Sequence, residues 1–161
     1  MYRYAIEELF KWKEKPNRKP MIIQGARHVG KTWLMKEFGK KAYTHTVYIN
    51  FEDNVTMEDL FSYDLDTNRL ITGIELYSGQ KIDPDNTLLI FDEVQEVPRA
   101  LTSLKYFNEN VPEYHIVCAC SFMGIDLHQG TSFPVGKVDL MNLYPLSYKE
   151  FLLATKQIDA L

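Results

Sequence analysis

Short apolar runs alternate along the chain with stretches in which apolar residues recur every three or four positions. The runs, bounded by turn residues, predict buried strands, and the longer spacing predicts amphipathic helices. The predicted strands are 21–24, 46–51, 88–93, 115–121 and 137–143. The predicted helices are 3–13, 32–41, a segment around 70–77, 98–110 and a last helix from 147. Because strands and helices alternate, the pattern predicts an α/β fold in which helices cover both faces of a mostly parallel sheet.

Turn-forming and capping residues support several of these boundaries. Pro16 and Pro20 end the first helix, since proline cannot continue a helix and restricts the residue before it. Gly79 stops the helix around 70–77, and Pro98 suits the first turn of the helix that follows. Ser147, with Glu150 three residues later, forms the capping box of the last helix.

The segment between the first predicted strand and the next helix has the sequence GARHVGKT. It fits G-x-x-x-x-G-K-[ST] in the strand–turn–helix setting that this phosphate-binding motif requires. Glycines let successive backbone N–H groups point inward, and the helix N-terminus adds partial positive charge. Lys31 would reach the β and γ phosphates, and the Thr32 hydroxyl would bind Mg²⁺. The residues predicted to contact the nucleotide are Gly25, Ala26, Arg27, His28, Val29, Gly30, Lys31, Thr32 and Trp33.

The alternative interpretation of this segment is an ordinary turn with a surface lysine, which the motif and its setting disfavour. Within the loop, Arg27 could contact phosphate, a partner's surface or only solvent. For His28 an exposed loop position without a partner is favoured.

Two acids, Asp92 and Glu93, end the third predicted strand. Ligands of open α/β sheets bind beyond the carboxyl ends of the strands. Asp92 would hold Mg²⁺ largely through its water shell, and Glu93 would orient or deprotonate an attacking water. Acids at a strand end also serve as caps, so the two acids alone are weak evidence for a metal site. Together with the phosphate-loop motif they become strong evidence. Paired acids favour water as the phosphoryl acceptor, hence hydrolysis over kinase transfer.

The fourth predicted strand ends in Cys118-Ala119-Cys120-Ser121. Ser121 could touch the γ-phosphate or the attacking water, or it could be a capping or loop serine. The two cysteines alternate with Ala119 and therefore project to one face of the strand. We expect them to be core residues, because a zinc site would need about two more ligands.

Composition bounds the function further. The chain has 161 residues, 45% of them hydrophobic and 25% charged, which indicates one globular domain, or one domain and a fragment of another. The net charge of −4 does not support nucleic-acid coating. No apolar run reaches the ~20 residues of a membrane span, and the N-terminus lacks a signal-peptide pattern. We expect a cytoplasmic protein whose acidic stretch, 52–66, is a solvated helical surface.

Four segments resemble the prokaryotic AAA-type ATPases that carry an extra C-terminal domain of unknown function. They are 25–32, 88–95 (LLIFDEVQ), 118–124 (CACSFMG) and 132–151 (SFPVGKVDLMNLYPLSYKEF). The resemblance implies a P-loop NTPase sandwich with a five-stranded sheet of order 5-1-4-3-2, and ATP with Mg²⁺ at the strand tips. It implies an N-terminal helix and linker over 1–20 and the ATPase core over 21–161, without the family's C-terminal domain. The roles it implies are nucleotide and Mg²⁺ binding for Lys31, Thr32 and Asp92, catalysis for Glu93 with Lys31, and a sensor role for Ser121.

The chain departs from that family in several respects. His28 stands where glutamine is usual, and Cys120 where glycine is usual, which could crowd the sensor and slow hydrolysis. Family members are commonly about twice as long. No arginine follows Arg99, so the arginine fingers of ring-forming relatives cannot come from this chain. Because such fingers raise turnover by orders of magnitude, we expect slow basal hydrolysis.

Two other functions stay open at this stage. A P-loop kinase for a small metabolite would need a basic lid, which the acidic stretch 52–66 argues against. A non-hydrolysing, nucleotide-dependent interaction module would bind a protein partner or self-associate through a surface such as Phe151, Leu152 and Leu153.

Overall fold

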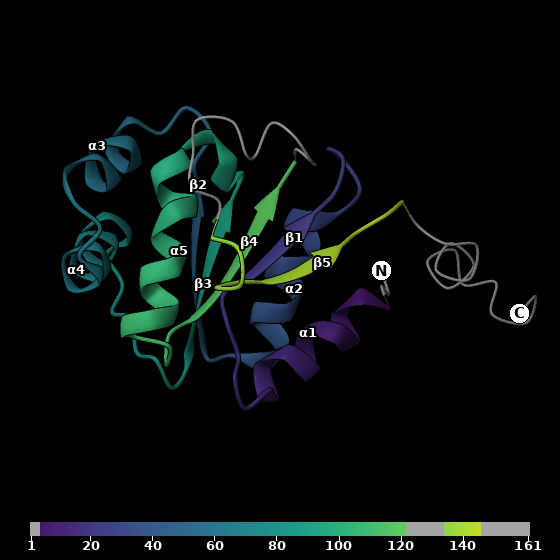
Figure 1. The fold of residues 1–161 in the computed structure, drawn as a ribbon. Helices are drawn as coiled ribbons and strands as arrows, with labels where there is room; N and C mark the ends of the chain where they lie inside the picture. Colours follow the sequence, from purple (N-terminus) through teal and green to yellow (C-terminus); the bar gives the residue numbers. More distant parts are fainter. Residues whose placement is uncertain (1–3, 122–133, 146–161) are drawn as a thin grey trace, which may run out of the picture.

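The computed structural model describes residues 4–121 and 134–145. Its strands run parallel through the middle of the molecule, between two layers of helix (Figure 1). The strands are β1 (Met21–Gln24), β2 (His45–Asn50), β3 (Thr87–Asp92), β4 (His115–Cys120) and β5 (Asp139–Asn142). The helices are α1 (Ala5–Glu14), α2 (Lys31–Ala42), α3 (Val55–Tyr63), α4 (Thr67–Ser78), η1 (Val94–Glu96, 3-10) and α5 (Pro98–Asn110).

The sheet has the order β2-β3-β4-β1-β5, and every pairing is parallel. This is the predicted order 5-1-4-3-2 counted from the other edge, so the predicted P-loop fold is confirmed. β1 lies between β4 and β5, with Gln24 opposite Cys120 on one side and Asn142 on the other. The phosphate-loop motif therefore leaves the sheet next to the end of β4, while β3 ends one strand further along.

Side chains from the two faces of the sheet enter two separate hydrophobic clusters. On β4, Cys118 and Cys120 join the cluster under α3, α4 and α5, whereas Val117 and Ala119 join the cluster under α1 and α2. Alternation along the strand causes this division, because successive side chains point to opposite faces. The prediction that the two cysteines share one face and lie in the core is thereby confirmed.

Helix α1 packs on the same face as α2. Ile6, Leu9 and Trp12, spaced three residues apart, are buried, and the ring of Trp12 meets Phe38 of α2 edge-on at 6.1 Å. The Trp12 indole also donates a hydrogen bond to the carbonyl of Lys19, 2.7 Å away. The predicted N-terminal helix and linker are thus packed against the sheet that they precede.

Several boundaries differ from the sequence prediction. Asn54 and Asp66 cap α3 and α4 through their side chains, so α4 begins earlier than the apolar pattern around 70–77 indicates. The acidic residues Glu58 and Asp59 of α3 are exposed, as a solvated surface requires. The predicted helix from Ser147 lies outside the described residues.

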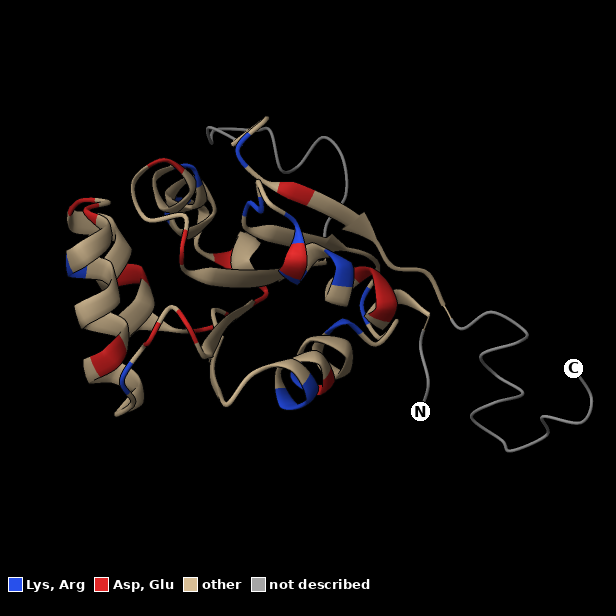
Figure 2. Ribbon diagram, turned by 90° about the horizontal axis from the view of Figure 1, so that it is seen from below, with Lys and Arg blue, Asp and Glu red and all other residues tan. Residues whose placement is uncertain are grey.

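Charged residues lie on several elements of the described chain, with Lys and Arg interspersed among Asp and Glu (Figure 2). Within the described residues, no helix is long and apolar enough to cross a membrane.

Candidate functional site

The phosphate-loop motif folds as a tight turn between β1 and α2. A Cβ on Gly25 would lie 2.5 Å from the carbonyl oxygen of Leu143, so this position has room only for glycine. Gly30, with φ of 100°, and His28, with φ of 68°, adopt the left-handed conformation that favours glycine and that few other residues take. His28 is exposed, as predicted. These angles turn the loop back toward the start of α2.

Lys31 is 5% exposed and lies folded into the loop that precedes it. Its ammonium donates hydrogen bonds to the carbonyl oxygens of Gly25 and Ala26, at 2.7 and 2.6 Å. Burial lowers the pKa of Lys31, and the nearby charges of Glu93 and Asp92 oppose this shift. The site thus holds a desolvated cation near two carboxylates.

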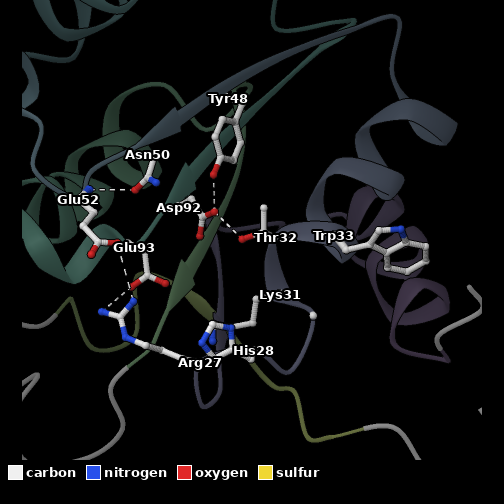
Figure 3. A pocket seen from close by; sticks show the side chains of 11 residues that line it. Arg27, His28, Lys31, Thr32, Trp33, Tyr48, Asn50, Glu52, Asp92 and Glu93 are labelled. Carbon is white, nitrogen blue, oxygen red and sulfur yellow. Dashed lines mark hydrogen bonds and ion pairs between the residues drawn. The ribbon is translucent and has the colours of Figure 1, made fainter. Parts of the chain in front are cut away.

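Asp92 ends β3 on the face of the sheet that α2 covers. Its Oδ2 accepts hydrogen bonds from the hydroxyls of Thr32 and Tyr48, each at 2.6 Å (Figure 3). Its Oδ1 is buried and has no hydrogen-bond partner among the described residues. A buried carboxylate oxygen without a partner carries a large desolvation cost. A divalent cation with its water shell is the kind of group that would satisfy it.

Glu93 follows in a left-handed backbone conformation, with φ of 53°. Its Oε1 accepts a hydrogen bond from the Ser121 hydroxyl at 2.5 Å, and its Oε2 accepts one from the Gln95 amide at 2.7 Å. The Gln95 amide oxygen in turn accepts a long hydrogen bond of 3.4 Å from the backbone N–H of Ser121. Each oxygen of the predicted catalytic carboxylate therefore accepts one hydrogen bond from a neighbouring side chain.

Arg27 extends from the loop toward three carboxylates. Its guanidinium lies 3.7 Å from Glu93, 3.8 Å from Glu52 and 3.8 Å from Glu96. The side chain is about half exposed, so each of these ion pairs contributes little to stability. Arg27 nevertheless places a second cation beside Glu93.

These side chains surround a polar pocket of about 330 Å³ (Figure 3). The predicted site residues that line it are Arg27, His28, Gly30, Lys31, Thr32, Trp33, Asp92 and Glu93. Ser121 joins the site through its bond to Glu93. Gly25, Ala26 and Val29 do not line the pocket, and the side chain of Val29 is buried in the core under α1 and α2.

Four residues of this site were not predicted from the sequence. Tyr48, Asn50 and Glu52 line the pocket from β2 and the turn after it, and Gln95 holds Glu93. A signal was present on β2, where polar side chains end a strand parallel to the one that carries Asp92. These polar residues belong to no known motif. That β2 pairs with β3, the strand that carries Asp92, is known only from the sheet topology.

The sheet order and this loop define a P-loop nucleotide-binding fold. Residues 17–152 match the model of a family described as an AAA domain. The chain therefore belongs to the AAA domain family and forms an ATPase-type core of it. No curated protein sequence matches the chain.

Solved structures share the fold at low sequence identity. The Walker-type ATPase PABY2304 of Pyrococcus abyssi superposes with a TM-score of 0.60 at 15% identity, covering 94% of this chain and 56% of that one. The Orc1 protein of Aeropyrum pernix, solved in complex with DNA, gives a TM-score of 0.50 at 11% identity, covering 97% of this chain and 47% of that one. The chain thus spans about half the length of these two proteins.

Proposed function

We propose that this chain binds ATP with Mg²⁺ and hydrolyses it slowly when no other protein is present. The observation that carries the proposal is that Lys31, at the start of α2, lines one pocket with Asp92 and Glu93, at the end of β3, beside a phosphate-loop motif. Lys31 is the cation, Asp92 the metal-binding carboxylate and Glu93 the candidate base, and these are the groups that phosphoryl transfer to water uses.

Binding would use the loop and the N-terminus of α2. The carbonyls of Gly25 and Ala26 hold the Lys31 ammonium where phosphate oxygens would replace them as partners. Exchange of neutral carbonyls for phosphate gives stronger, charge-assisted hydrogen bonds. The backbone N–H groups at the start of α2 add to the same field.

Thr32 and Asp92 fit a magnesium site. The Thr32 hydroxyl already donates to Asp92, and the buried Oδ1 of Asp92 has no partner among the described residues. When bound, Mg²⁺ would neutralise charge that develops on the phosphate oxygens. The role of this chain is to hold the Thr32 oxygen and the Asp92 carboxylate together on one side of the pocket.

Glu93 is the candidate base for water, and its contacts support a slow reaction. A base must reach the proton that it removes, yet both of its oxygens accept hydrogen bonds from Ser121 and Gln95. Each oxygen keeps a second lone pair, but the two bonds stabilise the ionised carboxylate and so make Glu93 a weaker base. Both contacts therefore support the slow turnover proposed here.

Tryptophan fluorescence tests the binding step directly. The chain has 2 tryptophans: Trp33 lines the pocket, whereas Trp12 is a buried residue of α1. We expect ATP with Mg²⁺ to change the emission of the wild type, and Lys31→Ala to weaken binding by more than about tenfold. The exposed Lys40→Ala on the same helix is the matched control and should bind as the wild type does. Equal affinity of all three proteins would reject the proposed site.

A further inference from the structure

The two oxygens of Asp92 have very different surroundings. Oδ2 accepts hydrogen bonds from both Thr32 and Tyr48, while Oδ1 has no partner among the described residues. A free carboxylate can rotate and exchange its oxygens. Two donors on one oxygen prevent this, because rotation would break both bonds. The carboxylate is thus fixed with one particular oxygen left for another group.

The fold explains why Tyr48 can reach Asp92. β2 and β3 run parallel with Tyr48 opposite Ile90 and Asn50 opposite Asp92. Side chains two positions apart on a strand share a face, so Tyr48 and Asp92 both lie on the α2 side. They are diagonal neighbours, a separation that long side chains span.

Tyr48 is itself held in place from above. The ammonium of Lys36, on α2, lies 4.1 Å from the centre of its ring. Its hydroxyl donates to Oδ2 of Asp92, so Tyr48 is fixed both at the face of its ring and at its hydroxyl.

From these contacts we infer that Tyr48 is a positioning residue for the magnesium site, which it serves by fixing the Asp92 carboxylate with Oδ1 available. The inference depends on the proposed function, since it assigns a further residue to the same site. Tyr48 touches neither the phosphates nor the metal in this role. It acts through Asp92, as the outer hydrogen-bond partners of metal ligands commonly do.

Tyr48→Phe tests the inference, because it removes only the hydroxyl and keeps the ring under Lys36. Mn²⁺ serves as the probe: it is titrated into protein saturated with ADP, and free Mn²⁺ is counted by electron paramagnetic resonance. We expect Mn²⁺ affinity to fall on the order of tenfold, the lower end of the effect of losing an outer partner of a metal ligand. ADP affinity measured in EDTA should stay unchanged.

Tyr43→Phe is the matched control. It also removes a tyrosine hydroxyl with a short hydrogen bond, 2.5 Å to His115, but Tyr43 follows the far end of α2. It should leave Mn²⁺ affinity at the wild-type value. Melting temperatures of both variants show whether each is folded.

A double-mutant cycle separates positioning from a general loss of structure. In the Asp92→Asn background, Tyr48→Phe should cause no further loss of Mn²⁺ affinity, because the carboxylate it positions is gone. Wild-type Mn²⁺ affinity in Tyr48→Phe, or an equal loss in both backgrounds, would overturn the inference while leaving the proposed function intact. Absence of ADP-dependent Mn²⁺ binding in the wild type would overturn both.

Discussion

The hydroxyl of Ser121, at the end of β4, donates a 2.5 Å hydrogen bond to Oε1 of Glu93, which follows β3. β3 and β4 are neighbours in the sheet, so two residues 28 positions apart in the chain meet at the strand ends. The bond links the predicted sensor to the predicted base. Substitution of either residue should therefore alter the hydrogen bonding of the other.

Glu93→Gln should retain nucleotide binding and lose turnover by about a hundredfold or more, the usual contribution of a general base. The amide keeps an oxygen that can accept from Ser121 but removes the basic group. Phosphate release and fluorescent-nucleotide binding measure the two effects. Glu96→Gln, which alters another carboxylate 3.8 Å from Arg27, is the control and should keep its turnover. Wild-type turnover in Glu93→Gln would show that Glu93 is not the base.

Gln95→Ala should raise turnover several-fold at unchanged nucleotide affinity. Gln95 donates to Oε2 of Glu93 at 2.7 Å and so helps to hold the carboxylate against Ser121. The loss of one neutral hydrogen bond of about 1 kcal/mol corresponds to a factor of roughly five. Steady-state phosphate release measures the change. A fall in turnover would mean that Gln95 instead orients Glu93 for catalysis.

Much of the fold follows from the sequence because its signals are local. The apolar strands, Pro98 at the first turn of α5, and Gly79 at the end of α4 are each set by residues within a few positions. The phosphate loop is also local, since its glycines and Lys31 lie within one turn. These elements were predicted within a few residues of their observed bounds.

The rest of the site depends on contacts between distant segments. Tyr48 reaches Asp92, 44 positions away, only because β2 and β3 pair in one particular register. The contact of Arg27 with Glu52 and Glu96 depends likewise on how the loops pack above the sheet. Periodicity carries no information about such pairs, and the side chains involved are common on any surface.

Cys120→Gly distinguishes two roles that the sequence left open. The structure places Cys120 fully buried in the hydrophobic cluster under α5, which supports the packing role over crowding of the nucleotide. We expect the glycine variant to lose on the order of 1 kcal/mol of unfolding free energy, from a small cavity and added backbone freedom. Turnover and ADP affinity should not change. Faster turnover at unchanged stability would favour crowding.

Acid should destabilise the protein through His115. Its ring lies at the start of β4, against Trp12 and Tyr43, and its Nδ1 is 2.5 Å from the Tyr43 hydroxyl. Burial, and then the positive charges of Arg18 and Lys13, lower the pKa of His115 from 6.5 to about 4. Between these two values the unfolded chain binds the proton and the folded chain does not. The free energy of unfolding contributed by this group is therefore complete above pH 6.5 and is lost as the pH falls toward 4.

His115→Phe measures this effect, because it removes the titrating group and keeps an aromatic ring in place. The ring of His115 is only partly buried, so the full pKa shift overstates the energy, and we expect about 1 kcal/mol. Urea unfolding at pH 7 and at pH 4.5 gives the loss of stability for each protein. The variant should start less stable at pH 7, where it lacks the bond to Tyr43, and should lose about 1 kcal/mol less on acidification than the wild type. An equal loss in both proteins would assign the acid sensitivity to the carboxylates instead.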